Sequence, residues 1–516
     1  MSTLDQNMEQ INYEQSLKNI PVPDRKKYCH MLINSAEKFL KNARWRAYFF
    51  LNPSTSNSKN NFGFRSLKAA KASKEMKNFE HDFIKLVSSI EFRNPSNPFQ
   101  DKLKSTCESI NSDSKLIIPA DKTTNFYRLE PEMYENLLEK NIQKDYKKEN
   151  ESAVKKINLA HSKITKDLDI NDRVFRTTER QAFVTLKDHK PNFSNNPTCR
   201  LLNPCKPEIG RISKKILENI NSTVRQKTKL NQWKNSSAVI GWFKALQNKE
   251  QLQFIQFDVV EFYPSISKNL LLKSVTWAKE FLNISDQEID IIMQSKKSIL
   301  YKDGTPWTKK GTHNFDVAMG SFDGAETCEI VGLYLLKDLV QLGIDLGLYR
   351  DDGLGACRLS PKETEAIKKK ICQIFKKHNL KITIEANLKV VTFLDVEFNL
   401  NKNTFSPYIK PNNKPLYVNA KSNHPPNITK NIPLAVNKRL SEISSNEEIF
   451  DKAAPTYQDA LDKSGYKFKL KYEPSQETRK QNNTRKRKIT WFNPPYAENV
   501  ETNIGKKFLR PVYCIR

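Results

Sequence analysis

The order of apolar segments between residues 252 and 386 constrains the fold of this chain more than any other feature. The first segment, "LQFIQFDVV" (252–260), is apolar and β-rich, which predicts a buried strand. Residues 324–343 are of helical length, rich in Leu and closed by a Gly, which predicts a helix. Two short apolar segments then flank the turn sequence Arg350-Asp351-Asp352-Gly353, as in a β-hairpin.

A second helix and a last strand complete this pattern. Ser360 stands at the N-cap position, Pro361 at the first helical position, and Glu363 where a capping box requires it. Four apolar residues follow at helical spacing and form one face: Ile367, Ile371, Ile374 and Phe375. "LKITIEA" (380–386) alternates as a strand does. The sequence therefore predicts an α+β fold with the order β-α-β-β-α-β, the ferredoxin-like topology, which serves many functions.

Three aspartates stand at informative places in this topology. Asp258 lies at the end of the first strand, and Asp351 and Asp352 lie at the turn of the hairpin. The first and third strands are neighbours in this topology, so the three carboxylates should converge on one edge of the sheet. Clustered carboxylates resist ionising together unless a cation neutralises them, and oxygen ligands suit Mg²⁺ or Mn²⁺. Two such ions support phosphoryl transfer. The alternative is an ordinary turn, because Asp-Asp-Gly is good turn chemistry.

The net charge of the chain favours a negatively charged partner. The 516 residues include 86 Lys and Arg against 58 Asp and Glu, a net charge of +28. A polyanion such as a nucleic acid would screen this charge, although a basic, solvated surface is an alternative. The polar N-terminus shows no secretory signal, and no long apolar run predicts a membrane span. The eight cysteines form no CxxC pair, so we expect no structural zinc and a reducing, intracellular location, nucleus or cytoplasm.

Several segments together resemble the motifs of reverse transcriptases. "FDVVEFYPSI" (257–266) and "YRDD" (349–352) resemble the first and third palm motifs, and "MGSFDGAE" (319–326) falls between them, where the family has its Gly-Ser motif. "FVTLKDHKPNFSNNPTCRLLN" (183–203) resembles the fingers motif, and "FLDVEF" (393–398) resembles the strand motif after the palm.

Further segments are similar to those of Penelope-like retroelements in particular. "IIPADKTTNFYRL" (117–129) resembles their fingers entry, and "NHPPNITKNIP" (423–433) with "SGYKFK" (464–469) resembles their thumb. "WFNPPYAENVETNIGKKFL" (491–509) is similar to the connector that precedes a GIY-YIG endonuclease. No GIY-YIG signature follows in this sequence, so we expect the endonuclease to be missing. The resemblance covers roughly residues 115–509.

The resemblance implies a right-hand polymerase with fingers, a ferredoxin-like palm and a thumb. It implies an RNA-directed DNA polymerase that uses deoxynucleotides, an RNA template and a DNA or RNA primer. Asp258 and Asp351 would hold two Mg²⁺ ions (Mn²⁺ being an alternative), with Asp352 supporting. Tyr263 matches the family's bulky residue that rejects a ribose 2′-OH.

Other matched positions would bind the nucleotide. Lys187 and Arg200 match the fingers cations that hold the triphosphate, a role for which the planar guanidinium of Arg200 is well suited. Gly320 and Ser321 would line the nascent base pair. Lys389 is a candidate general acid that protonates pyrophosphate, with Lys381 as its rival and a solvated surface position as the alternative for both.

The sequence departs from the family's motifs at two places in this region. Phe322-Asp323-Gly324 stands where a Ser-Pro is usual, which puts the grip on the template in doubt. Arg350 stands where a small or apolar residue is usual, so we expect it to point away from the core or to pair with an acid.

Four regions are expected along the chain. Residues 1–114 should form a basic, mostly helical region, and residues 115–400 the fingers and palm. Residues 401–478 should form a thumb-like region, and 479–516 a basic linker with a truncated connector. Two other functions stay open: a polymerase that copies RNA into RNA, against which Tyr263 argues, and a nucleic-acid-binding remnant without catalysis. The sequence indicates no membrane partner and leaves the oligomeric state undefined.

Overall fold

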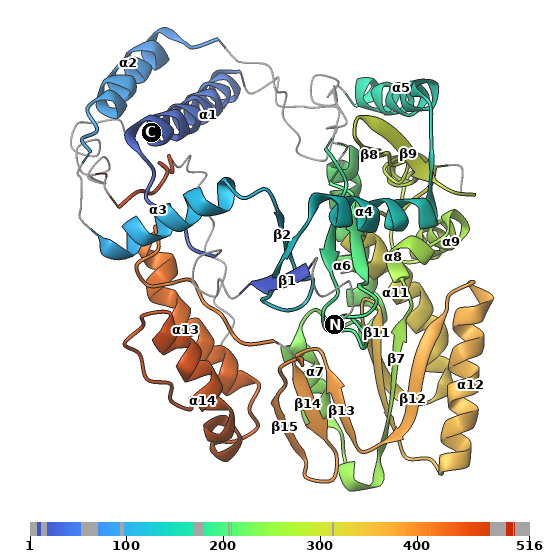
Figure 1. Ribbon diagram of the computed structural model, residues 1–516. Helices are drawn as coiled ribbons and strands as arrows, with labels where there is room; N and C mark the ends of the chain where they lie inside the picture. The colour runs from blue at the N-terminus through green and yellow to red at the C-terminus, as the bar shows by residue number, and fades with distance from the viewer. Residues whose placement is uncertain are drawn as a thin grey trace.

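The chain folds into helices and small β-sheets, which confirms the expected α+β class (Figure 1). The computed structural model describes residues 8–11, 18–52, 71–92, 97–168, 180–204, 207, 209–311, 314–411, 413–474, 492–498 and 500. Within these residues no helix is long and apolar enough to cross a membrane. Of the predicted basic linker and truncated connector, 479–516, the structure describes residues 492–498 and 500.

A four-stranded antiparallel sheet, called the central sheet below, has the order β10-β11-β7-β12. Its strands are β7 (Gln253–Val259), β10 (Asp345–Tyr349), β11 (Asp352–Cys357) and β12 (Ile382–Leu388). The first and third strands along the chain, β7 and β11, are therefore neighbours, as the sequence predicts. Gly353 of β11 lies opposite Phe257, and a Cβ at Gly353 would come 2.1 Å from the Phe257 ring. Only glycine fits this close approach.

The connection from β7 to β10 is longer than the single predicted helix. Its last part, α11 and a 3-10 turn that ends at Gly343 with φ of 70°, matches the predicted 324–343 helix. The complete connection contains α8 (Phe262–Ser265), α9 (Lys268–Ala278), α10 (Asp286–Gln294), β8 (Leu300–Lys302), β9 (Thr305–Lys309), α11 (Gly324–Leu339) and η4 (Val340–Leu342). The return helix α12 (Pro361–Lys377) starts with the predicted capping box of Ser360 and Glu363.

The two faces of the central sheet pack against different layers. Ile255 and Phe257 of β7 belong to a core with α6 (Ile209–Thr228), α9, α10, α11 and α12. Phe254 and Leu354 point to the opposite face, where they pack with α7 (Ser236–Ala245) and a small sheet of β13 (Val390–Phe393), β14 (Val396–Asn399) and β15 (Thr404–Pro407). Because side chains alternate along a strand, Asp258 and Asp352 share the face of Phe254 and Leu354.

A group of short strands precedes the central sheet along the chain. β5 and β6 form a hairpin whose buried residues, such as Val184 and Leu186, pack with α4 in a separate core. An isolated bridge from Ala120 to Leu186 joins this hairpin to the strand pair β2 and β3. The elements are β2 (Leu116–Pro119), β3 (Phe126–Leu129), α4 (Pro131–Asp145), β4 (Tyr146–Lys148), α5 (Glu151–Asp167), β5 (Phe183–Leu186), β6 (Cys199–Leu202) and η3 (Lys249–Gln251).

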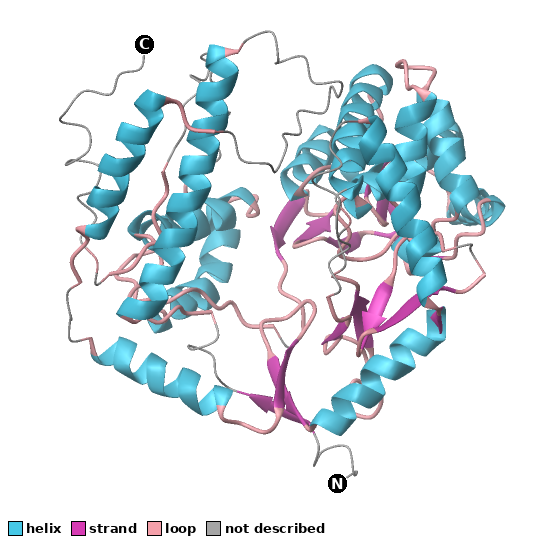
Figure 2. Cartoon of the chain, turned by 90° about the horizontal axis from the view of Figure 1, so that it is seen from above, coloured by secondary structure: helices cyan, strands magenta, loops and turns pink. Residues whose placement is uncertain are grey.

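Helices from the N-terminal region and the helices that follow residue 425 lie on one side of the molecule, apart from the central sheet (Figures 1 and 2). Gln100 accepts a hydrogen bond from the Val22 amide at 2.9 Å and donates to the Lys421 carbonyl at 2.7 Å. The Tyr28 hydroxyl donates to the Pro495 carbonyl at 3.0 Å. The elements here are β1 (Met8–Ile11), which pairs with β3, α1 (Arg25–Leu51), α2 (Lys74–Ser88), α3 (Pro98–Asn111), α13 (Pro426–Glu442) and α14 (Glu447–Lys463).

Candidate active site

The three predicted aspartates meet at one end of the central sheet. Asp258 of β7 and Asp352 of β11 are direct cross-strand partners, and Asp351 occupies the turn before β11. The Val259 amide donates to the Asp351 carbonyl at 3.0 Å, which holds this turn against the end of β7. The strand order predicted from the sequence accounts for this arrangement, because it makes β7 and β11 neighbours.

The electrostatics of these acids are those of a crowded carboxylate group. Burial, and then the charge of Asp351, raise the pKa of Asp258 above its usual range. Burial, and then Asp351 and Asp258, raise the pKa of Asp352 to about 7. Asp258 and Asp352 are cross-strand partners, and each acts on the pKa of the other. The oxygen-only donor set suits a hard divalent cation. In the part of the chain that the structure describes, however, no group of three or more acids, histidines or cysteines is arranged so that it could hold a metal ion.

Lysines from three separate segments lie near these acids. Lys122 and Lys190 lower the pKa of Asp258 through their charges, although burial of Asp258 outweighs them. Burial, and then the neighbouring Lys122, lower the pKa of Lys410, whereas Asp352 acts on it in the opposite direction. Sequence reasoning missed Lys122 and Lys410 as site residues. Lys122 stood within the quoted 117–129 motif, but no local pattern marks Lys410.

Hydrogen bonds of the β2–β3 loop explain why these lysines come together. The Thr123 hydroxyl donates to Asp188 at 2.6 Å, which ties the loop to the segment that carries Lys190. The Thr124 amide donates to the Asn413 side chain at 3.0 Å, and the Thr124 hydroxyl donates to the Lys414 carbonyl at 2.9 Å. The loop is thus held between the β5–β6 hairpin and the segment that follows β15, with Lys122 in the loop.

Lys187 and Arg200, the two residues predicted to bind the triphosphate, line one cavity of about 90 Å³. Met319 lines the same cavity. Arg200 Nη1 lies 3.0 Å from Asp121 Oδ1, so this guanidinium is already paired. Burial, and then the nearby Arg200, lower the pKa of Lys187. Glu261, on the same cavity, pairs with Lys144 at 2.7 Å. The structure therefore brings Lys187 and Arg200 together.

Tyr263, Gly320 and Ser321 also meet, at the start of α11. Gly320 has φ of 103°, and a Cβ there would lie 2.8 Å from the Asn203 carbonyl oxygen, so this position requires glycine. A Cβ at Gly324 would lie 2.8 Å from Ser321 Oγ and 3.2 Å from Tyr263 Cε1. Burial raises the pKa of Tyr263. The aromatic ring and the loop thus form one packed wall.

Lys389 is not brought to the acids. Its Nζ donates to the carbonyls of Glu250 at 2.8 Å and Leu252 at 2.6 Å, just before β7 begins. Asp258 stands at the other end of the same strand. The rival lysine is placed differently, because the Val260 amide donates to the Lys381 carbonyl at 2.9 Å beside the acids. The antiparallel pairing of β12 with β7 separates the two candidates.

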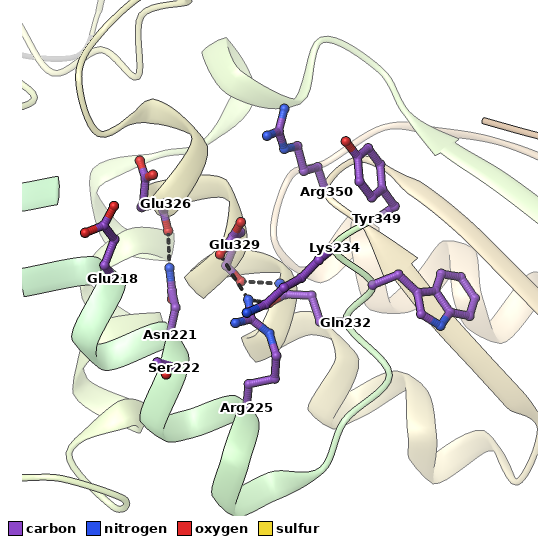
Figure 3. A pocket seen from close by; sticks show the side chains of 11 residues that line it. Glu218, Asn221, Ser222, Arg225, Gln232, Lys234, Glu326, Glu329, Tyr349 and Arg350 are labelled. Atoms are coloured by element: carbon purple, nitrogen blue, oxygen red, sulfur yellow. Dashed lines mark hydrogen bonds and ion pairs between the residues drawn. The ribbon is translucent and has the colours of Figure 1, made fainter. Parts of the chain in front are cut away.

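Arg350 borders a second cavity, of about 340 Å³, between α6 and α11 (Figure 3). In this cavity the Arg225 guanidinium pairs with the Glu329 carboxylate at 3.0 Å and donates a hydrogen bond to the Gln232 side-chain oxygen at 2.6 Å. Arg350 has φ of 56°, and its guanidinium lies 5.6 Å from the Tyr349 ring centre, extending away from Arg225 in Figure 3. Burial lowers the pKa of Arg350, but the charges of Tyr263, Tyr349 and Glu329 together raise it, and among the described ion pairs none includes Arg350.

Comparisons with known proteins do not assign this chain to a family. No family model and no curated protein matches the chain. Similar solved structures include telomerase from Candida albicans with a fragment of telomeric RNA, at 12% identity and a TM-score of 0.47 over 77% of this chain and 68% of that one. Apo telomerase from Candida Tropicalis has 10% identity and a TM-score of 0.44, over 76% and 75% of the two chains. The BmCPV RNA-dependent RNA polymerase at elongation state has 10% identity and a TM-score of 0.37, over 66% and 30%. Such values are too low to define fold or function, which rest here on strand order and site geometry.

Proposed function

We propose that this chain is an RNA-directed DNA polymerase of the Penelope-like retroelement type, which adds deoxynucleotides to a primer 3′-OH. The observation that carries the proposal is the cross-strand pair of Asp258 and Asp352 with Asp351 at the adjoining turn. The nearby Lys122 and Lys190 support it, because phosphoryl transfer needs fixed positive charge close to the acids.

The parts of a right-hand polymerase correspond to separate parts of the chain. The central sheet would be the palm, and the β5–β6 hairpin with its neighbours would be the fingers, within residues 115–400. The helices α13 and α14 would form the thumb, within residues 401–478. The order β10-β11-β7-β12 supports this division, because it brings Asp258 and Asp352 together at one end of the proposed palm. Residues 1–114 and 479–516 would be accessory regions.

Asp258 and Asp351 would hold two Mg²⁺ ions, with Asp352 supporting them. The raised pKa of Asp258 and of Asp352 supports a cation site, since the acids cannot all ionise without added positive charge. Divalent ions bound there would activate the primer 3′-OH and stabilise the leaving oxygen.

The protein's own side chains would bind the nucleotide. Lys187 and Arg200 share a cavity that opens beside Met319, and a triphosphate there would be neutralised by both. Tyr263 and Ser321 pack together at the start of α11, which supports a wall against the sugar and the base. A bulky ring below the sugar excludes a ribose 2′-OH, which favours deoxynucleotides over ribonucleotides.

Primer extension on an RNA template tests this function. The wild-type protein with Mg²⁺ should extend a DNA primer, and Asp258→Asn should lower the rate by roughly 100-fold or more. Asp286→Asn is the control, because this side chain is 97% exposed on α10. Extension with ribonucleotides instead would favour an RNA-copying polymerase. Salt-sensitive RNA binding without incorporation in Mg²⁺ or Mn²⁺ would favour a non-catalytic remnant.

A further inference from the structure

A fully buried ion pair lies behind the loop that carries Gly320 and Ser321. Lys296 Nζ lies 2.6 Å from Asp323 Oδ2, and both side chains are 1% exposed. The Ser295 hydroxyl donates to the same carboxylate oxygen at 2.7 Å. Removing two charges from water costs several kcal/mol, and an apolar pair of similar volume is often as stable. Stability of the fold alone therefore does not explain why Lys296 and Asp323 are buried as an ion pair.

The segment that carries Lys296 holds this loop at both of its ends. At the first end, the Asp316 amide donates to the Lys296 carbonyl at 2.8 Å. The Asp316 carboxylate is itself held by the Tyr146 hydroxyl, which donates to it at 2.6 Å. At the second end, the ion pair to Asp323 is the attachment. Residues 295 and 296 thus span the loop from 316 to 323.

Asn203 holds the opposite side of the same loop. Its amide donates to the Met319 carbonyl at 3.1 Å, and its side chain donates to the Ile299 carbonyl at 3.1 Å. Gly320 lies directly on the Asn203 carbonyl, where no Cβ would fit. Asn203 and Met319 both line the cavity of Lys187 and Arg200. The shape of the loop therefore determines one wall of that cavity.

Asp323 also connects the loop to α11. Its carbonyl accepts hydrogen bonds from the Thr327 amide at 3.0 Å and the Thr327 hydroxyl at 2.7 Å, in the first turn of that helix. Ser321 and Tyr263 pack against the next residue, Gly324. A shift of the Asp323 carboxylate would therefore move the helix start, the loop and the aromatic ring together.

We propose that Lys296 and Asp323 are positioning residues for the incoming nucleotide. The pair fixes the loop of Gly320 and Ser321, and with it Tyr263, at one place beside the acids. It thereby sets the affinity for the nucleotide and the selection against ribose, although neither side chain touches the substrate. This inference rests on the proposed polymerase function. It also assigns a role to Asp323, where the sequence departs from the reverse-transcriptase motif.

The test replaces both charges by neutral groups of similar size, Lys296→Met with Asp323→Asn. The double variant leaves no charge buried alone, and the amide that replaces the Asp323 carboxylate has nearly the same size, so folding should be retained. We expect the KM for deoxynucleotides to rise about 5- to 10-fold while kcat stays within about 2-fold. The preference for deoxynucleotides over ribonucleotides should fall by a similar factor. The control removes an exposed pair, Lys279→Met with Asp286→Asn, and should change none of these values.

Hydrogen exchange provides a readout that needs no catalysis. Amides in residues 316–328 should exchange at least about 10-fold faster in the double variant than in the wild type, because the loop has lost its attachment. A folded double variant with wild-type KM, sugar preference and exchange would overturn the inference. A wild-type protein that extends no primer would overturn the proposed function instead, and with it the substrate role of the pair.

Discussion

Asp258 and Asp352 are direct cross-strand partners on β7 and β11, and their side chains share the sheet face opposite to α11 and α12. Asp351, at the turn beside them, is the second cause, after burial, that raises the pKa of both carboxyls. This arrangement has measurable consequences for pH dependence, nucleotide use and packing.

The stability of the metal-free protein should fall between about pH 4 and about pH 7 because of Asp352. Its folded pKa is raised to about 7, mainly by burial, whereas an unfolded Asp titrates near ~3.9. The folded state therefore binds the extra proton, and stability is lost as the pH rises from about 4 to about 7. Asp352→Asn removes this loss, so the variant should gain on the order of 2 kcal/mol relative to wild type at pH 8.

Chemical denaturation at pH 4, 6 and 8 without divalent ions measures this effect. The difference between Asp352→Asn and wild type should be close to zero at pH 4, because the carboxyl is then protonated in the folded state and about half protonated in the unfolded state. Asp286→Asn, at an exposed position, serves as the control. A constant difference at all three pH values would show that burial of Asp352 does not perturb its ionisation.

Gly353 should tolerate no side chain. A Cβ there would lie 2.1 Å from the Phe257 ring, and both residues are in paired strands that have little room to move. Gly353→Ala should therefore lower the free energy of unfolding by about 2–3 kcal/mol. Gly241→Ala is the matched control, because nothing lies within 4 Å of its Cβ position in α7, and alanine favours a helix. Thermal unfolding in which the two variants behaved alike would contradict this packing.

Tyr263 should decide between deoxynucleotides and ribonucleotides. Its ring packs against Gly324 beside Ser321, so truncation would open space where the sugar is proposed to bind. Tyr263→Val should reduce the preference for deoxynucleotides by roughly 10- to 100-fold in competition assays. Tyr263→Phe keeps the ring and should keep the preference. If both variants discriminated like the wild type, the sugar would contact another part of the protein.

The lysines near the acids should contribute to nucleotide binding although they come from distant segments. Lys122→Gln and Lys410→Gln should each raise the KM for deoxynucleotides by about 3- to 10-fold, because each removes positive charge close to Asp352. Lys402→Gln, in the exposed β14–β15 turn, serves as the control. Steady-state kinetics with an unchanged KM in both cluster variants would exclude these lysines from the substrate site.

Local pattern by itself determined much of the central unit of this protein. The β-rich segment at Asp258, the hairpin turn at Asp352 and the Ser360–Glu363 capping box all lie where the sequence predicts them. The reason is that burial patterns and capping depend on residues close together along the chain. The neighbouring positions of β7 and β11 then follow from the topology.

Contacts between distant segments were decided only by the tertiary structure. Lys410 lies near Lys122 because Thr124 donates hydrogen bonds to residues 413 and 414. No local sequence pattern predicts such a contact. Lys389 faces the wrong end of β7 because its side chain reaches the carbonyls of Glu250 and Leu252. The buried pair of Lys296 and Asp323 likewise depends on how two loops pack. The sequence thus determined the strands, the helices and the positions of the three aspartates along them. Long-range packing determined which lysines lie near those aspartates.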